Sequence, residues 1–369
     1  MAEAAPPRSV AGPLAWARTN LFSGFGNTLT TLAILALLAW AVPPVLRFLF
    51  VDAVWSGTSG EACRPEVVGR PVGACWAFIG EKFGYFVYGS YPLAERWRVN
   101  LVFALAAFGL TWMLWLDAPR RGLGAIVSFG ILPLAGFVLL SGSPLLGLRP
   151  VPTALWGGLL VTIVVALTGI VASLPLGILL ALGRRSSLPV LRYACIGFIE
   201  FWRGVPLITV LFMANVMLPL FLPGDLTVDR LVRPLIGIAL FASAYMAEVV
   251  RGGLQAIPKG QAEAAAALGL TKAQAMRHVI LPQALKIVVP GIVNTMIGLF
   301  KDTTLVGIVG IADFIRTIEA SRADPRWSAP MVPLTAYAFA ALVYFAACFA
   351  MARYAGFIER RLAAGDRNG

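Results

Sequence analysis

The chain has 369 residues, of which 59% are hydrophobic and only 13% carry a charge. Soluble domains are about 45–50% apolar and about 25% charged. The mean hydropathy of +0.81 likewise indicates a more apolar chain than a soluble domain. These values exclude a soluble enzyme, a disordered chain and a coiled coil. They predict an all-α, multi-pass integral membrane protein.

The charge balance is basic, with 30 Lys and Arg against 18 Asp and Glu and a net charge of +12. The basic residues separate apolar runs and form no patch, so orientation in a membrane explains them better than nucleic-acid binding. We therefore expect a lipid bilayer as a partner and no nucleic acid.

Apolar stretches along the chain predict about eight transmembrane helices. The first ends near Ala39-Trp40-Ala41, as a secretory signal does, but its length favours an uncleaved anchor. Whether Pro189–Gly204 adds a span is open at this point. The stretches are Asn20–Leu46, Val99–Leu116, Gly122–Leu148, Pro150–Gly183, Gly204–Gly224, Pro234–Ala247, Ile287–Ala312 and Trp327–Ala352.

The distribution of charge over the loops predicts that the N- and C-termini are both cytoplasmic. With that orientation the inner segments hold 16 basic and six acidic residues, and the outer segments hold 12 basic and 10 acidic. Many of the outer basic residues lie in one long loop, which counts less in the positive-inside rule. The inner segments are 1–19, 117–121, 184–192, 248–286 and 353–369.

Cys63 and Cys75 fall in this long outer loop, at about residues 51–97, where the compartment would be oxidising. Glycines and prolines around them allow the segment to turn back on itself, so we expect a disulfide. Two buried, unpaired thiols are the alternative. Cys195 and Cys348 lie near or within spans and should stay reduced.

The polar loop at about residues 251–286 contains an alanine-rich segment, Gln261–Leu268, that predicts a helix closed by Gly269. Thr271 can cap a second helix that runs through His278 and is ended by Pro282. The short first helix could enter a cleft of another protein or rest on the membrane surface. Composition alone does not decide between the two.

The spacing in this loop resembles the EAA loop of binding-protein-dependent ABC permeases. Glu263, Ala264 and Ala265 are followed after three residues by Gly269, and after nine more by a segment that ends in Leu281-Pro282. The one departure from the family pattern is Val279 in place of Ile, which keeps an apolar side chain of similar size.

Three further segments resemble the polar amino-acid permease branch of that family. They are FIEFWRGVPL (Phe198–Leu207), YMAEVVRGGLQAIPKGQ (Tyr245–Gln261) and FKDTTLVGIVGIADF (Phe300–Phe314). The three spans before this core, the long outer loop and Asp324-Pro325-Arg326-Trp327 are similar to the M-type subunit of the general L-amino-acid uptake systems of proteobacteria. The resemblance implies an extension at 1–150 and a permease core at 151–363.

The resemblance also implies a fold, a location and partners. The fold would be that of type I ABC importers in a bacterial inner membrane, and the cargo polar or general L-amino acids moved from periplasm to cytoplasm. A second permease subunit, two copies of a cytoplasmic ATPase and a periplasmic amino-acid-binding protein would complete the importer. ATP and Mg²⁺ would bind the ATPase, since the sequence has no phosphate-binding G-x-x-x-x-G-K-[ST] motif.

Charged residues in or near the spans are candidates for the translocation pathway. Glu200 with Arg203, and Glu248 with Arg251, are spaced to meet on one helix face, and either pair could simply anchor a helix end. Lys301, Asp302, Thr303 and Thr304 interrupt an apolar span, where a charge facing lipid is costly. This quartet offers both charges and hydroxyl groups to a zwitterionic amino acid, although structural pairing with other helices is an alternative.

Two other classes of protein would fit a chain with charged residues inside spans. A secondary amino-acid transporter would show inverted repeats, which the sequence lacks, and would not need an EAA loop. An enzyme embedded in the membrane would need clustered His, Cys or carboxylates, whereas the chain has one histidine, His278. The sequence thus favours a non-catalytic importer subunit.

Overall fold

The computed structural model describes residues 12–115, 118–223 and 228–365. Within these ranges the regular structure is helical, and β-type pairing is limited to three isolated bridges. The all-α class predicted from the sequence is confirmed. The extreme termini, including the charges at Glu3, Arg8, Asp366 and Arg367, lie outside the described residues, as do Asp117 and Gly224.

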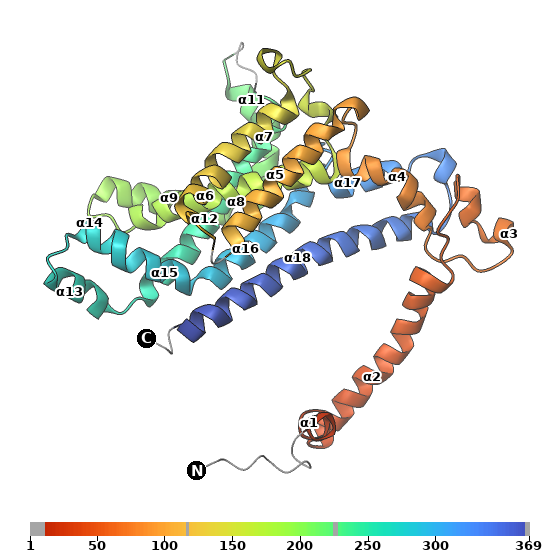
Figure 1. The fold of residues 1–369 in the computed structure, drawn as a ribbon, viewed down its shortest axis with the longest axis horizontal. Helices are drawn as coiled ribbons and strands as arrows, with labels where there is room; N and C mark the ends of the chain where they lie inside the picture. The colour runs from red at the N-terminus through yellow and green to blue at the C-terminus, as the bar shows by residue number, and fades with distance from the viewer. Residues whose placement is uncertain (1–11, 116–117, 224–227, 366–369) are drawn as a thin grey trace. The chain divides into compact units, whose positions relative to one another are not determined.

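The contacts divide the chain into two compact units, drawn together in Figure 1. The first contains Met1–Glu81 and Asp324–Thr335, and the second contains Lys82–Ala323 and Ala336–Gly369. The expected boundary at residue 150, between an extension and a permease core, stays a prediction.

The first unit holds one long apolar helix and a small folded segment. Its elements are α1 (Pro13–Asn20), α2 (Phe25–Leu46), the π turn η1 (Arg47–Val51), η2 (Gly60–Cys63), α3 (Pro65–Val68), the start of α4 (Trp76–Tyr88), η10 (Pro325–Trp327) and the start of α18 (Val332–Gly365).

The small segment folds around Trp327, whose side chain is fully buried. Gly60 lies directly against it, because a Cβ at Gly60 would come within 2.9 Å of the Trp327 backbone. The Arg64 guanidinium donates a hydrogen bond of 2.8 Å to the Ser328 carbonyl.

The second unit contains the rest of α4, from Lys82, and the remaining helices. They are η3 (Leu93–Glu95), α5 (Arg96–Leu114), α6 (Arg121–Ile126), η4 (Val127–Ile131), α7 (Leu132–Ser141), η5 (Pro144–Leu146), η6 (Thr153–Leu155), α8 (Gly158–Gly183), α9 (Pro189–Gly204), α10 (Leu207–Phe212), η7 (Met213–Met217), α11 (Leu218–Phe221), α12 (Val232–Ala256), α13 (Lys259–Ala267), α14 (Lys272–Ala275), η8 (Met276–Ile280), α15 (Leu281–Ile287), α16 (Val289–Asp302), η9 (Thr303–Val309), α17 (Phe314–Ser321) and the rest of α18.

Among the described residues, seven helices are long and apolar enough to span a membrane, and a bent helix pair would make an eighth. They are Phe25–Val51, Leu93–Leu114, Gly122–Ser141, Gly158–Gly183, Val232–Ala256, Val289–Val309 and Val332–Leu362, with the bent pair Pro189–Gly204 and Leu207–Phe221. The count agrees with the predicted eight, although most of the predicted ends shift by several residues.

The bent pair corrects the predicted span Gly204–Gly224. The two helices meet at 101° around Pro206, and α9 is part of the pair instead of a separate span. The bend has a local cause, since Val205 is extended at φ −105° and ψ 132°, as a residue before proline prefers. A count of uncharged residues could not detect this bend.

The core of the second unit is the packing of α8 along α12. Small residues recur every four positions on the buried face of α8, at Gly169, Ser173, Gly177 and Ala181. A Cβ at Gly177 would lie 2.7 Å from the Met246 side chain, so the two helices approach closely there. Small residues at this spacing allow membrane helices to pack tightly.

Candidate functional site

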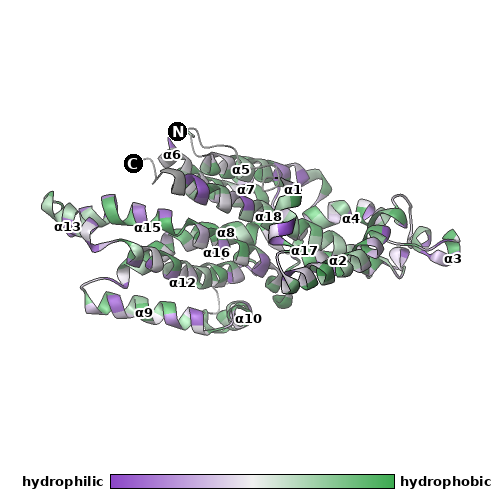
Figure 2. Ribbon diagram, turned by 90° about the horizontal axis from the view of Figure 1, so that it is seen from below, coloured by the Kyte–Doolittle hydropathy of each residue, from purple (hydrophilic) through white to green (hydrophobic). Residues whose placement is uncertain are grey.

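The EAA segment forms a short exposed helix at one end of the second unit. Figures 1 and 2 both place α13 beyond the ends of α9 and α12. Glu263 and Ala264 are exposed, whereas Ala265 is 2% exposed and packs inward. The helix therefore presents one carboxylate and a face of small side chains.

The predicted stop at Gly269 is confirmed in its geometry. Gly269 has a φ of +76°, its N–H donates to the Ala266 carbonyl at 2.9 Å, and the Leu270 N–H donates to the Ala265 carbonyl at 3.1 Å. These two bonds form a Schellman motif, which requires a left-handed residue that glycine supplies best. Helix α13 begins at Lys259, two residues before the predicted start.

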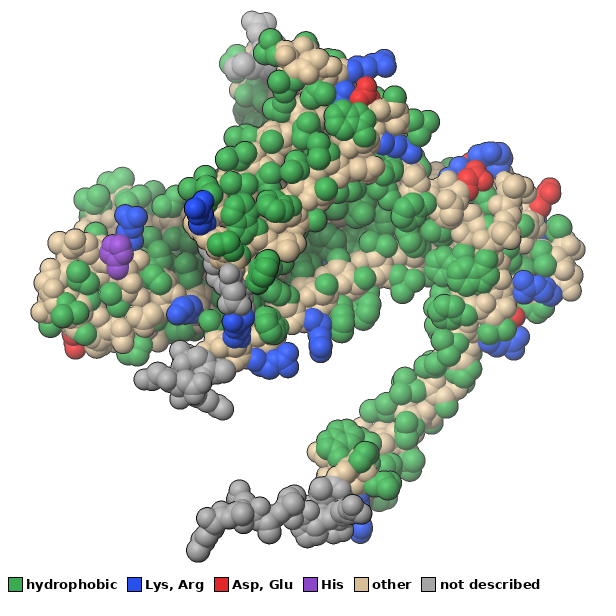
Figure 3. Space-filling view, in the orientation of Figure 1, with side chains coloured by type: hydrophobic (Ala, Val, Ile, Leu, Met, Phe, Trp, Pro, Cys, Tyr) green, Lys and Arg blue, Asp and Glu red, His purple; other side chains and the backbone are tan. Residues whose placement is uncertain are grey.

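The second helix of the loop is also capped as predicted. The Thr271 hydroxyl accepts from the Gln274 N–H at 3.3 Å, and the Gln274 side chain accepts from the Thr271 N–H at 2.9 Å. This reciprocal pair is a capping box. His278 follows on the exposed surface of the loop, where Figure 3 shows the single histidine.

The predicted end of that helix at Pro282 is wrong. The chain continues from α14 through the π turn η8 into α15. Leu281 and Pro282 are the first two residues of α15. Proline lacks an N–H and clashes with a normal preceding turn, and the wider π turn accommodates it. Leu281 packs against the core cluster that contains Met246 and Val250 of α12.

Two contacts that the sequence did not predict hold the loop together and join it to the preceding span, α12. The Gln283 side-chain amide donates to the Gln261 side chain at 3.1 Å, which joins α15 to α13. At Gly253 of α12, an added Cβ would lie 2.6 Å from the Ala284 carbonyl, so α12 and α15 meet backbone to backbone. α13 is thus connected to α12 through α15, by a side-chain hydrogen bond between α13 and α15 and by a backbone contact between α15 and α12.

A cluster of three arginines and two glutamates joins the same ends of α8, α9 and α12. Glu248 is at its centre, with its carboxylate 2.8 Å from Arg184, 2.8 Å from Arg251 and 3.5 Å from Arg203. Its side chain is only 16% exposed, so these ion pairs are partly shielded from solvent. The cluster retains one positive charge in excess.

This cluster corrects one predicted pair and confirms another. Glu248 pairs with Arg251 as the spacing indicates, but Glu200 pairs with Arg184 at 3.2 Å and Arg203 pairs with Glu248. Arg184 was missed because it lies 64 residues from Glu248 and no local pattern connects them.

The quartet at residues 301–304 lies where α16 gives way to the 3₁₀ segment η9. Lys301 is exposed and Asp302 half-buried, and within the described residues neither has an ion-pair partner. The Thr303 and Thr304 hydroxyls donate to the Phe300 and Lys301 carbonyls at 2.8 and 3.0 Å. Thr303 is buried, so only the half-buried Thr304 hydroxyl is accessible to another group, and it keeps only its acceptor capacity.

The structure does not bring all the candidate pathway residues together. Glu200, Arg203 and Glu248 share the arginine cluster, but within the described chain no hydrogen bond or ion pair links them to the quartet. The two groups therefore form separate charged positions.

In the first unit, the structure joins Cys63 and Cys75 in a disulfide with a Cα–Cα distance of 5.8 Å. Both cysteines are fully buried, and the Cys75 N–H donates to the Thr335 hydroxyl at 2.8 Å. Cys195 and Cys348 are free thiols. The disulfide and Thr335 thereby connect the segment to the start of α18.

Comparisons with known proteins add to this geometry. A family model described as "Binding-protein-dependent transport system inner membrane component" matches residues 173–364. The inner membrane amino-acid ABC transporter permease protein YhdY of Escherichia coli (strain K12) is 47% identical over 352 residues, which cover 95% of this chain and 94% of that protein.

Two further relatives differ in length. The glutamate/glutamine/aspartate/asparagine transport system permease protein BztC of Rhodobacter capsulatus is 39% identical over 415 residues, covering 96% of this chain and 95% of that protein. The glutamate/aspartate import permease protein GltK of Escherichia coli O6:H1 is 32% identical over 211 residues, covering 56% of this chain and 92% of that protein. The chain belongs to the family of binding-protein-dependent transport system inner membrane components.

Proposed function

We propose that this chain is a permease subunit of an ATP-driven importer that moves polar or general L-amino acids from the periplasm to the cytoplasm. The observation that carries the proposal is the exposed EAA helix α13, capped at Gly269 and fastened to α12 through α15. Relatives named as amino-acid permeases support the choice of cargo. The chain is not an enzyme, and in this family separate ATPase subunits hydrolyse ATP.

We expect α13 to be the element that an ATPase subunit binds. A helix with exposed small side chains can lie close inside a cleft, and Glu263 supplies one charged contact. Closure of two ATPase copies around ATP and Mg²⁺ would move α13, and the contacts at Gln283 and Gly253 would pass the motion to α12. The nucleotide and its metal stay on the ATPase in this proposal.

The protein resides in the inner membrane, and we propose that both termini face the cytoplasm. Four of the five segments assigned to the inner side, all except 1–19, belong to the second unit, where contacts bring two pairs of them close together, and this supports that topology. Arg184 contacts Glu248 there, and the Tyr354 hydroxyl donates to the Leu114 carbonyl at 2.7 Å. The charge count then favours the cytoplasmic side for these segments.

The proposed pathway has two charged positions. Lys301 and Asp302 offer complementary charges to an amino acid within the span, and the half-buried Thr304 adds an acceptor oxygen, whereas the Thr303 side chain is buried. The cluster around Glu248, which includes Glu200 and Arg203, lies at the end that we assign to the cytoplasm. A second permease subunit would form the other wall, and a periplasmic binding protein would deliver the cargo.

Reconstitution tests this function. The chain is purified with the candidate second permease and ATPase and placed in liposomes, and ATP hydrolysis is measured with the binding protein and with each amino acid. Stimulation that requires both the binding protein and its ligand supports an importer. Uptake driven by an ion gradient without ATP would instead identify a secondary transporter.

A further inference from the structure

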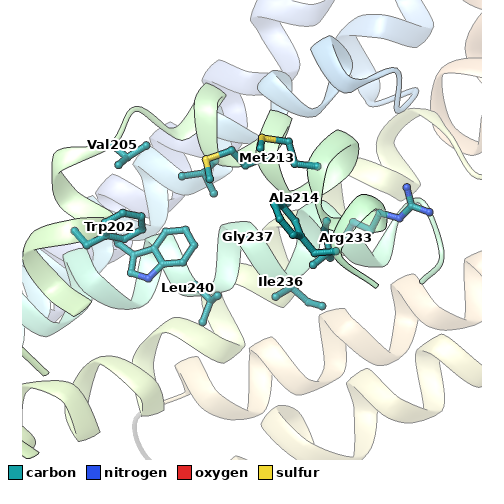
Figure 4. Close-up of a pocket in the computed structure, with 13 residues that line it drawn as sticks. Trp202, Val205, Met213, Ala214, Arg233, Ile236, Gly237 and Leu240 are labelled. Carbon is teal, nitrogen blue, oxygen red and sulfur yellow. The ribbon is translucent and has the colours of Figure 1, made fainter. Parts of the chain in front are cut away.

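An apolar cavity lies between α9, the π turn η7 and α12 in the second unit. Its volume is about 250 Å³, and all the elements around it belong to the bent helix pair or to α12. Figure 4 shows Trp202, Met213, Ile236 and Leu240 around this space. An enclosed, engineered apolar cavity of about 150 Å³ stays dry and binds benzene; the larger cavity here is partly open, but its walls have the same apolar chemistry and suit a hydrocarbon.

The walls do not suit a transported amino acid. Apart from Arg233, every described wall residue has an apolar or aromatic side chain or is a glycine. An ammonium or carboxylate buried there would lose its hydration without gaining hydrogen bonds, which is strongly unfavourable.

The cavity is also separate from the charged cluster. Successive residues of an α-helix point about 100° apart. Phe201 and Trp202 of α9 line the cavity, so Glu200 and Arg203, on either side of them in sequence, face the opposite side of the helix. The proposed pathway and the cavity thus occupy different faces of α9.

One charged group lies at the edge of the cavity. The Arg233 guanidinium donates to the Val228 carbonyl at 2.9 Å and to the Asn215 carbonyl at 3.0 Å. Both acceptors are neutral, and within the described residues no carboxylate pairs with Arg233. Figure 4 shows this guanidinium beyond the apolar side chains. Its charge is left for an anion from outside the described chain.

We propose that this cavity binds an anionic phospholipid, with an acyl chain between α9 and α12 and the phosphate at Arg233. A flexible chain can follow a narrow space, and the thioethers of Met213 and Met217 adapt to its shape. With the Arg233 guanidinium at its edge, the cavity favours an occupant that joins a hydrocarbon chain to a negative charge. The site does not depend on which solute the protein carries.

The test uses the complete purified complex and phospholipids with brominated acyl chains, which quench nearby tryptophan fluorescence. Phosphatidylglycerol and phosphatidylcholine with the same brominated chains are titrated separately. The Trp202→Phe variant gives the background from the other tryptophans. Ala214→Phe fills the cavity, and Val216→Phe is the matched control because Val216 is exposed on the same π turn outside the cavity wall.

We expect saturable quenching of Trp202 by brominated phosphatidylglycerol and weaker quenching by brominated phosphatidylcholine. Ala214→Phe should weaken binding about tenfold for every two methylene groups it displaces, and Val216→Phe should leave it unchanged. Arg233→Gln should remove the preference for phosphatidylglycerol.

Three results would overturn the proposal. They are quenching that rises with lipid but never saturates, equal effects of Ala214→Phe and Val216→Phe, and equal quenching by the two lipids in the unaltered protein. A fourth such result is the absence of any Trp202 component, which would mean that no acyl chain lies beside Trp202. Should Ala214→Phe fail to assemble, the unaltered protein and Trp202→Phe decide the question by themselves.

Discussion

Replacing Gly269 with alanine should weaken the coupling of ATP hydrolysis to transport. Gly269 holds a φ of +76°, and an added Cβ would meet no atom within 4 Å, so the substitution causes backbone strain without a clash. A left-handed conformation costs an L-residue about 1–2 kcal/mol. A change of about 1 kcal/mol shifts an equilibrium roughly fivefold. The last turn of α13 should therefore open roughly 5 to 30 times more often.

Gly260 provides the matched control on the same helix. It lies inside α13 with a helical backbone and with no atom within 4 Å of an added Cβ. Gly260→Ala should stabilise the helix by up to about 1 kcal/mol, because alanine is the better helix former. The two variants add the same methyl group and are expected to act in opposite directions.

The assay compares amide hydrogen exchange at residues 259–271 with uptake and ATPase activity in proteoliposomes. Gly269→Ala should exchange faster in the last turn and transport fewer amino acids for each ATP hydrolysed, whereas Gly260→Ala should do neither. A wild-type transport-to-ATP ratio in Gly269→Ala, with faster exchange observed, would refute the link between this cap and coupling. The bulkier and charged Gly269→Asp, like Glu263→Lys, should uncouple transport further.

Three other predictions concern the two charged positions and the disulfide. Glu248→Gln should lower the stability of the complex by about 2–3 kcal/mol, because hydrogen bonds to charged groups contribute about that much. Glu200→Gln, which changes a more exposed carboxylate, should lower it less. Equal shifts of the two variants in thermal unfolding would contradict this prediction. Asp302→Asn should reduce uptake more than assembly, and normal uptake by a normally assembled complex would make Asp302 purely structural. Cys63→Ser should remove about 3 kcal/mol of loop-closure stabilisation. In the unaltered protein, labelling of both Cys63 and Cys75 by an alkylating reagent without prior reduction would show that the bridge is absent.

Local patterns predicted the coupling loop well because its stability depends on nearby residues. The positive φ at Gly269 and the capping box at Thr271 each involve partners within five positions. Continuation of the helix through Pro282 was not predictable, since a π turn absorbs the missing N–H and leaves no mark in composition. Sequence rules for proline describe the regular α-helix and not this exception.

Contacts between distant segments were beyond what one sequence could predict. Arg184 could have paired with any nearby carboxylate, and only the packing of α8 along α12 places it beside Glu248. Lys301 and Asp302, in contrast, were recognisable as interruptions of an apolar run. The sequence therefore identified candidate residues, and the fold determined which of them meet.

The path from the coupling loop to the span depends on small residues more than on charged ones. Gly253 lets α12 touch the backbone of α15, and Gly177 lets α8 lie against α12 at Met246. Backbone contacts have no rotamers to absorb a displacement, so movement of α15 should carry α12 with it. α12 has 25 residues, about 38 Å at 1.5 Å per residue. We therefore expect a shift at the loop to move the entire span, and the ion pairs of Glu248 to carry it to α8 and α9 at the same end.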